Sequence, residues 1–146
     1  MKIVNEVNPD PIAACMALNV CPSSPSARGK VTQLTVTPTS GKQGANFNIF
    51  MQFQILNTTG TGQIFFEVNP PGQNNGSPFA GTANFQTLPP GTYTSSFQVS
   101  SQPNQDNPFN PGLYSVVGAI CESMCGGTSK WAYTLGEANS KFTITP

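Results

Sequence analysis

The chain contains no histidine and few charges, and both absences restrict the chemistry open to it. Histidine is the commonest general base and a frequent metal ligand, so catalytic triads built on it, most zinc hydrolase sites and the usual pH switch are excluded. Only 8% of the residues are charged, and six Lys and Arg balance six Asp and Glu. Because phosphate contacts require a basic surplus, we expect no nucleic-acid binding. No apolar run approaches a membrane span, and the N-terminus lacks the apolar stretch of a signal peptide.

Uncharged polar residues are abundant instead. Asn, Gln, Thr and Ser together supply 52 of the 146 residues, so the surface is expected to stay soluble through amides and hydroxyls. The length suits one domain of ordinary size with a short appendage and is too short for two independent cores.

The chain divides into three zones, which differ in apolar periodicity. The zones are residues 1–21, 22–30 and 31–146. In the first, Pro11 suits the first turn of a helix and Asp10 its N-cap, so a helix is expected over 11–18. The second, PSSPSARGK, is rich in Pro and Ser and is typical of a linker. The third has an apolar period of two and is expected to form the folded domain.

The period of two is clearest over residues 47–55. There Phe47, Ile49, Met51, Phe53 and Ile55 alternate with mostly amide side chains, as in a strand with one face in a core. Six further segments show this alternation or a weaker form of it. The expected strands are 31–38, 47–55, 64–68, 93–99, 114–120, 130–135 and 141–145. The sequence therefore predicts an all-β fold, an antiparallel sandwich of about seven strands after a short N-terminal helical segment.

The segment PGLYSVVGAIC at 111–121 resembles the penultimate strand of immunoglobulin-like sandwiches. In those domains a Tyr soon after a Pro-Gly turn hydrogen-bonds to the backbone upstream, and Tyr114 is expected to be that residue. Cys121, however, has no cysteine partner in the 47–55 segment, and Trp131 lies on a late strand rather than the third. The resemblance therefore implies an immunoglobulin-like β-sandwich without the core chemistry of antibody domains.

The segment NEVNPDPIAACMALNVC at 5–21 resembles the C-terminal end of a saposin B-type domain. Such domains close with a proline, a short helix and two cysteines separated by five residues, positions held here by Cys15 and Cys21. The resemblance implies a remnant of a helical lipid-binding module. The two cysteines near the start of such a domain are missing, so a complete saposin fold cannot form from this chain. We expect the chain to begin inside a longer secreted precursor rather than to result from proteolysis.

The four cysteines form two close pairs. Spacings of five and three intervening residues do not fit the CxxC pattern of zinc sites, and a disulfide between Cys121 and Cys125 is expected. The state of Cys15 and Cys21 is left open by the sequence: they are free thiols, bonded to each other, or bonded to another chain. Asn57 begins an Asn-Thr-Thr sequon in a predicted turn and is the expected glycosylation site.

Large apolar side chains in or next to predicted loops are the candidates for binding. These are Phe79, Phe85, Phe109, Met124 and Trp131. The first two lie in the segment 69–91, which is rich in Pro and Gly and has no reliable strand. If exposed, they suit carbohydrate stacking, peptide capture or a membrane interface, and if buried they cap the sandwich, which we favour. The same alternatives apply to Phe109 and Trp131, and Met124 lies in the loop that the expected disulfide closes.

The residues that could support catalysis are few. The carboxylates are Glu6, Asp10, Glu67, Asp106, Glu122 and Glu137. All six are expected to be solvated surface acids, because Glu67 is on the outward side of its strand and the others fall in loops or termini. A cysteine nucleophile would lack a histidine base. We therefore expect neither an enzyme nor a metal or cofactor site; a calcium site near Asp106 has too little charge.

The expected function is that of a non-enzymatic binding module, secreted or lysosomal/vacuolar, which meets a protein or cell-surface partner through its loops. The alternative is lipid binding or transfer in a cavity between the sheets, which ten Phe residues permit. Edge strands of a short sandwich can pair with other chains, and we expect a monomer or a weak self-associator.

Overall fold

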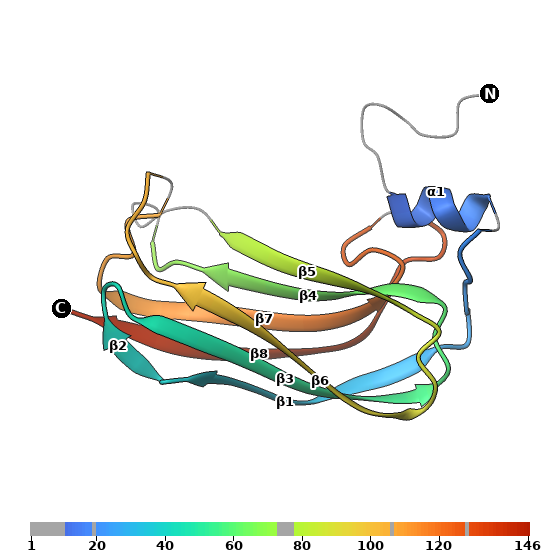
Figure 1. Ribbon diagram of the computed structural model, residues 1–146, viewed down its shortest axis with the longest axis horizontal. Coiled ribbons are helices and arrows are strands. Elements are labelled where there is room, and N and C mark those ends of the chain that lie inside the picture. Colours follow the sequence, from blue (N-terminus) through green and yellow to red (C-terminus); the bar gives the residue numbers. More distant parts are fainter. Residues whose placement is uncertain (1–10, 19, 73–77, 106, 128) are drawn as a thin grey trace.

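In the computed structural model, two β-sheets pack face to face and a short helix lies at one end (Figure 1). The structure describes residues 11–18, 20–72, 78–105, 107–127 and 129–146. The elements are α1 (Pro11–Ala17), β1 (Arg28–Thr37), β2 (Ser40–Lys42), β3 (Asn46–Asn57), β4 (Thr61–Asn69), β5 (Phe79–Gln86), β6 (Gly91–Ser100), β7 (Gly112–Glu122) and β8 (Tyr133–Thr145). The predicted all-β class is confirmed, and α1 lies where a helix was expected.

The strand order is β1-β3-β6 in one sheet and β2-β8-β7-β4-β5 in the other. The described strand pairs are antiparallel with one exception, since β2 runs parallel to the end of β8. The expectation of a purely antiparallel sandwich is therefore corrected at this edge. The parallel pair is short, because β2 has only three residues.

The core lies between the sheets and is built by the alternation of β3. Its five apolar residues from Phe47 to Ile55 are each at most 1% exposed, as predicted. Aromatic rings from the facing sheet meet them: the Phe47 and Phe142 ring centroids lie 4.4 Å apart, and those of Tyr114 and Phe142 lie 5.2 Å apart. Burying each such side chain contributes about 2–3 kcal/mol, so this interface between the sheets is the main source of stability.

Two strand assignments from the sequence are wrong. The segment 69–91 contains β5, in which the half-buried Gly81 and the exposed Ala83 stand between Phe79 and Phe85, so its alternation gives a weak apolar signal. Residues 133–135 and 141–145 belong to a single strand, β8, which pairs with β7 along its length, and residues 130–132 precede that strand. Gly136, within this strand, allows close packing, because a Cβ there would lie 2.8 Å from the Cα of Lys30 in β1.

The start of β7 is held by the hydrogen bond that the sequence PGLY at 111–114 predicts. The Tyr114 hydroxyl donates to the carbonyl of Asn110 at 2.8 Å, and the Tyr114 side chain is fully buried. Tyr93 makes an analogous bond to the Pro89 carbonyl at 2.7 Å, but at an exposed position. The two bonds therefore form a matched pair, one from a fully buried tyrosine and one from a half-buried tyrosine.

We predict that Tyr114→Phe lowers the free energy of unfolding by about 1.5 kcal/mol, because the hydrogen bond made by a fully buried side chain is lost. Tyr93→Phe is the control, with an expected loss below about 0.5 kcal/mol, since water can bond to the exposed Pro89 carbonyl. Urea denaturation of both variants measures the difference. Equal losses in the two variants would contradict the assignment.

Candidate functional site

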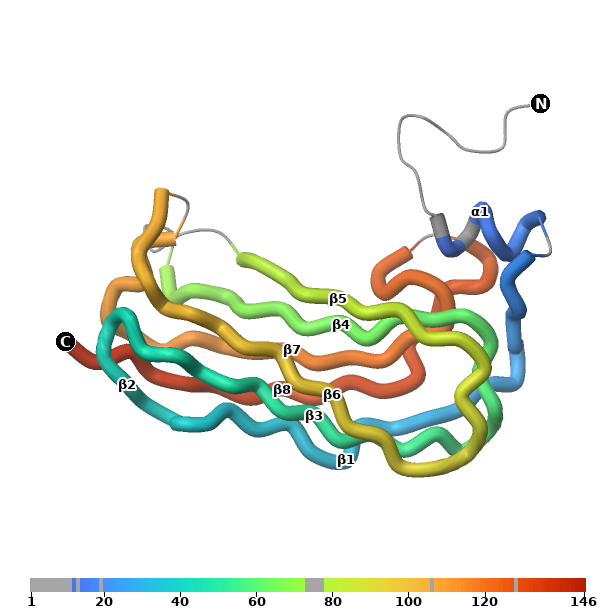
Figure 2. Tube along the Cα trace, viewed as in Figure 1, coloured from blue at the N-terminus to red at the C-terminus, as the bar shows by residue number. Residues whose placement is uncertain are grey.

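Both disulfides lie at the same end of the sandwich, which we call the disulfide end. It comprises α1, residues 20–27, the β3–β4 turn, the β5–β6 turn and the β7–β8 connection. These segments are adjacent in Figures 1 and 2, and the C-terminus lies at the opposite end. The residues that line the three cavities described below come from these segments and the adjoining strand ends.

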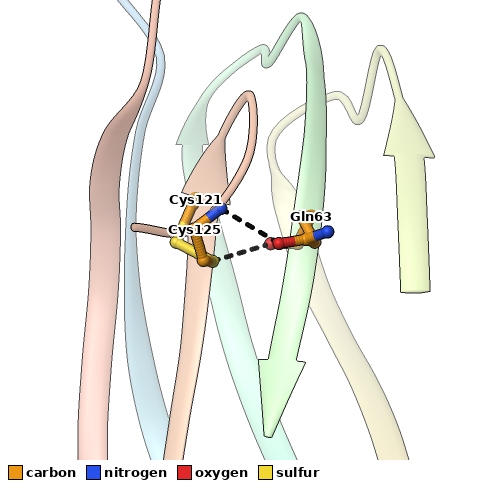
Figure 3. The surroundings of a disulfide bond; sticks show 3 residues. All are labelled: Gln63, Cys121 and Cys125. Carbon is orange, nitrogen blue, oxygen red and sulfur yellow. Dashed lines mark hydrogen bonds between the residues drawn. A yellow bond between two sulfur atoms is a disulfide. The ribbon is translucent and has the colours of Figure 1, made fainter. Parts of the chain in front are cut away.

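The connection that follows β7 is closed by the pair Cys121–Cys125, whose Cα atoms lie 5.3 Å apart. The Cys125 N–H donates to the side-chain oxygen of Gln63 in β4 at 3.0 Å (Figure 3). Ser123 and Gly126 adopt φ values of 61° and 73°, so the chain turns back sharply toward β4. A disulfide across so short a loop stabilises the fold by about 2 kcal/mol, because it lowers the conformational entropy of the unfolded chain.

Cys15 and Cys21 are bonded to each other, with their Cα atoms 5.2 Å apart, so one of the three alternatives left by the sequence holds. The N–H groups of Val20 and Cys21 donate to the Cys15 carbonyl at 3.1 and 3.3 Å and close the helix C-terminus. The helix packs on the sandwich through Ile12 and Met16, which are 6% and 4% exposed. α1 is therefore held at the disulfide end by apolar contacts.

A buried carboxylate joins three separate segments at this end. Glu122, the last residue of β7, is 1% exposed. Its carboxylate accepts hydrogen bonds from the backbone N–H of Ser24 at 2.9 Å and from that of Gly60 at 3.1 and 3.2 Å. Ser24 precedes β1 and Gly60 lies in the β3–β4 turn. Burial raises the pKa of Glu122, and the two backbone donors oppose this rise in part.

Glu122 was expected to be a solvated surface acid, and this was wrong. A signal was present, because Glu122 has the same parity as Tyr114, Val116 and Ile120. Strand side chains alternate between faces, so extending the predicted strand 114–120 by two residues places Glu122 on the core side. Its backbone partners could not be predicted, since they come from distant segments.

Residues 22–27, inside the stretch expected to be a linker, are fixed to the sandwich. The Tyr133 hydroxyl lies 2.9 Å from the Ser24 carbonyl and 3.0 Å from that of Ala27, within hydrogen-bond distance of both. A Cβ at Gly60 would lie 2.6 Å from the backbone of this segment, so a glycine is needed for the close approach. The segment therefore forms part of the wall of the disulfide end.

Two cavities flank this segment. The larger, of about 700 Å³, includes Leu56, Asn57 and Tyr133 in its lining. The smaller, of about 250 Å³, is bordered by Glu122, Trp131 and Tyr133. Leu56 and Tyr133 are 45% and 37% exposed, so both offer apolar surface to a partner. Asn57 is exposed at the end of β3, and its side-chain amide donates to the Ser26 carbonyl at 3.0 Å.

A third cavity, of about 360 Å³, lies between α1 and the ends of β4 and β5. Ile12 and Phe85 supply its apolar lining together with the Cys15–Cys21 bond. Thr61 also lines it, and its hydroxyl is buried without a hydrogen-bond partner. Phe85 is half-buried, so it lies between the exposed and the buried alternatives that the sequence left open.

The predicted binding residues do not gather at one place. Met124 and Trp131 lie at the disulfide end, where Phe85 also lines a cavity. Phe79 and Phe109 pack edge to face with their ring centroids 5.8 Å apart, and Phe109 stacks on Tyr114 with centroids 6.2 Å apart. Phe109 is only 4% exposed, so this pair caps the core.

Other chemistry is limited in the part of the chain that the structure describes. No group of three or more His, Cys, Asp or Glu side chains gathers there to hold a metal ion. None of its helices is long and apolar enough to span a membrane. The proposed N-cap Asp10 and the calcium candidate Asp106 lie outside the described residues.

The fold and the disulfide end together define a class: a two-sheet β-sandwich domain with disulfides and cavities concentrated at one end. A comparison with known families assigns it further, since the profile of the Countin C-terminal domain matches residues 29–146. The chain belongs to this Countin family.

Curated relatives in Dictyostelium discoideum align with nearly the whole chain. Countin-1 is 30% identical over 99% of this chain, Countin-2 is 32% identical over 99%, and Countin-3 is 31% identical over 99%. The alignments cover 55%, 56% and 64% of those proteins respectively. The chain therefore spans between half and two thirds of the length of these relatives.

Solved structures share the fold at low sequence identity. The DNA glycosylase AlkC of Pseudomonas fluorescens superposes on 92% of this chain with a TM-score of 0.59 at 11% identity, over 33% of AlkC. The CARDB domain of the Pyrococcus furiosus protein PF1109 superposes on 82% of this chain, over 93% of that domain, with a TM-score of 0.52 at 9% identity. These similarities concern the fold alone.

The family match corrects the interpretation of residues 5–21 as the end of a saposin B-type domain. The family indicated is the Countin C-terminal domain, and relatives that align over 99% of the chain are countins, so no saposin-type domain is indicated. In the described part of this segment, Cys15 and Cys21 bond to each other. Two cysteines five residues apart beside a short helix are too small a motif to identify a family.

We predict a pH dependence of stability that Glu122→Gln abolishes. Folding raises the pKa of Glu122 above its usual 4.5, so its contribution to stability is complete below that pH and is lost as the pH rises through the folded pKa. The free energy of unfolding of the wild type, relative to the variant, is therefore expected to decrease as the pH rises above about 4.5. Urea titrations across this range measure it.

Glu137→Gln, at an exposed position on β8, controls for the loss of one negative charge. A wild-type advantage over Glu122→Gln that grows with pH would show that hydrogen bonding to the carboxylate outweighs its burial.

Proposed function

We propose that the chain is a non-enzymatic, secreted recognition domain that binds a protein or cell-surface partner through the disulfide end. The supporting observation is that cavities and exposed apolar side chains gather at the disulfide end, whereas side chains fill the space between the sheets. Three cavities and four of the exposed large apolar residues lie at this end. Those four residues are Leu18, Val20, Leu56 and Tyr133.

Aromatic and aliphatic side chains fill the space between the sheets. Phe66 and Phe97 stack with ring centroids 5.7 Å apart, and Phe53 and Tyr93 do so at the same distance. A lipid held between the sheets would have to displace these contacts. The alternative of lipid binding in such a cavity therefore lacks support, whereas binding at the end of the sandwich leaves the core intact.

Secretion is supported by the cysteines and by the sequon. Two disulfides persist in oxidising compartments and are rare in the cytosol. Asn57 is exposed, as a glycosylated residue must be. Nothing comparable supports a lysosomal or vacuolar location.

We further propose an immunoglobulin-like arrangement for the sandwich. The strand orders β1-β3-β6 and β8-β7-β4-β5 correspond to the A-B-E and G-F-C-C′ sheets of that fold. The bond from Tyr114 to Asn110 corresponds to the tyrosine corner at the start of strand F. Loops at the ends of such sandwiches commonly serve recognition, which agrees with binding at the disulfide end.

We predict that Trp131→Ala combined with Leu56→Ala weakens partner binding at least about tenfold, because half-buried aromatic and aliphatic side chains beside cavities dominate interface energies. The measurement is saturation binding of the fluorescently labelled chain to the surface of cells from its source organism. Leu113→Ala is the matched control, since Leu113 is 53% exposed at the far end of β7 and should leave affinity within about twofold.

Full binding by the double variant, or equal weakening by Leu113→Ala, would place the binding surface elsewhere. Thermal melts of all three proteins confirm that each variant is folded before its affinity is interpreted.

A further inference from the structure

The sandwich has two sides at which its sheets end, and they differ in how their edge strands are protected. The strand orders place β1 and β2 at one side and β5 and β6 at the other. An edge strand exposes unpaired N–H and C=O groups that can pair with another chain, and proteins prevent this with charge, proline, bulges or very short strands. The two sides therefore differ in their capacity for strand addition.

The side formed by β1 and β2 carries several of these protections. β1 contains Arg28 and Lys30 and has two register shifts against β3. β2 is three residues long and includes Lys42. Charges and bulges at this side oppose the approach of another strand.

β5 carries none of these protections. Its eight residues, FAGTANFQ, include no charge and no proline, and it pairs with β4 without a register shift. Ala80, Thr82, Ala83 and Asn84 are exposed and small. Within the described part of the chain, β5 pairs with β4 alone, at the margin of the five-stranded sheet (Figure 1).

Side chains fill the space between the two sheets next to β5, so this edge strand is held in place by packing. The Phe97 ring of β6 packs directly under Gly81, where a Cβ would lie 2.7 Å from a ring carbon, and it stacks on Phe66 of β4. A strand added to β5 would therefore extend an ordered sheet rather than a loose one.

We propose that β5 pairs antiparallel with β5 of a second copy of this chain and joins the two five-stranded sheets. A two-fold axis at Thr82 would set Phe79 opposite Phe85 and Gly81 opposite Ala83, so residues of the same face of the sheet lie opposite one another, as antiparallel pairing requires. It also brings no like charges together, because β5 has none. The two-fold symmetry closes the assembly at a dimer.

The test compares two lysine substitutions in the full chain by sedimentation velocity over a concentration series. Thr82→Lys places two positive charges at the proposed axis and is expected to raise the dimer dissociation constant at least about tenfold. Asn48→Lys puts the same charge at an exposed position of β3, a central strand, and should change the constant less than about twofold.

Hydrogen exchange of the wild type gives an independent reading that does not depend on the folding of a variant. Protection of amides in Phe79–Gln86 is expected to increase with protein concentration, while that in β6 stays constant. A monomer at all concentrations, a Thr82→Lys chain that dimerises like the wild type, or concentration-dependent protection in β6 instead of β5 would each overturn the proposal. None of these outcomes bears on binding through the disulfide end.

Discussion

One buried carboxylate determines the shape of the disulfide end. Glu122 accepts backbone hydrogen bonds from Ser24 and Gly60, so the end of β7, the segment before β1 and the β3–β4 turn meet at a single side chain. A buried carboxylate is stable only where donors compensate its lost hydration. The two backbone groups provide part of this compensation, and they fix the chain before β1 to the end of β7.

The disulfide end and the interior of the sandwich serve different purposes. Between the sheets, rings such as Phe47 and Phe142 fill the space and supply stability. At the disulfide end, a disulfide and hydrogen bonds hold the chain in place. The Cys121–Cys125 pair fixes one loop, and the Tyr133 hydroxyl holds residues 22–27. Cavities remain between these fixed segments because hydrogen bonds and disulfides hold backbone in place without filling volume.

Sequence periodicity predicted those parts of the fold that depend on alternation along one strand. The inward face of β3 from Phe47 to Ile55 is the clearest case. β5 was missed because Gly81 and Ala83 give little apolar signal, and its pairing is set by β4 rather than by its own side chains. Trp131 and Phe85 were identified from the sequence as candidate binding residues, but Glu122 was expected at the surface and is buried. The three segments that meet at Glu122 are remote in sequence, and local patterns carry no information about such contacts.

The Glu122 carboxylate holds the backbone of residues 22–27 and of the β3–β4 turn against the sandwich. Native-state hydrogen exchange of the Ser24 and Gly60 amides tests it most directly, because neither amide belongs to a strand. The account predicts slow exchange at both, within the range of strand amides, and much faster exchange at both in a Glu122→Ala chain. Rapid exchange of these two amides in the wild type, with the strands still protected, would contradict it.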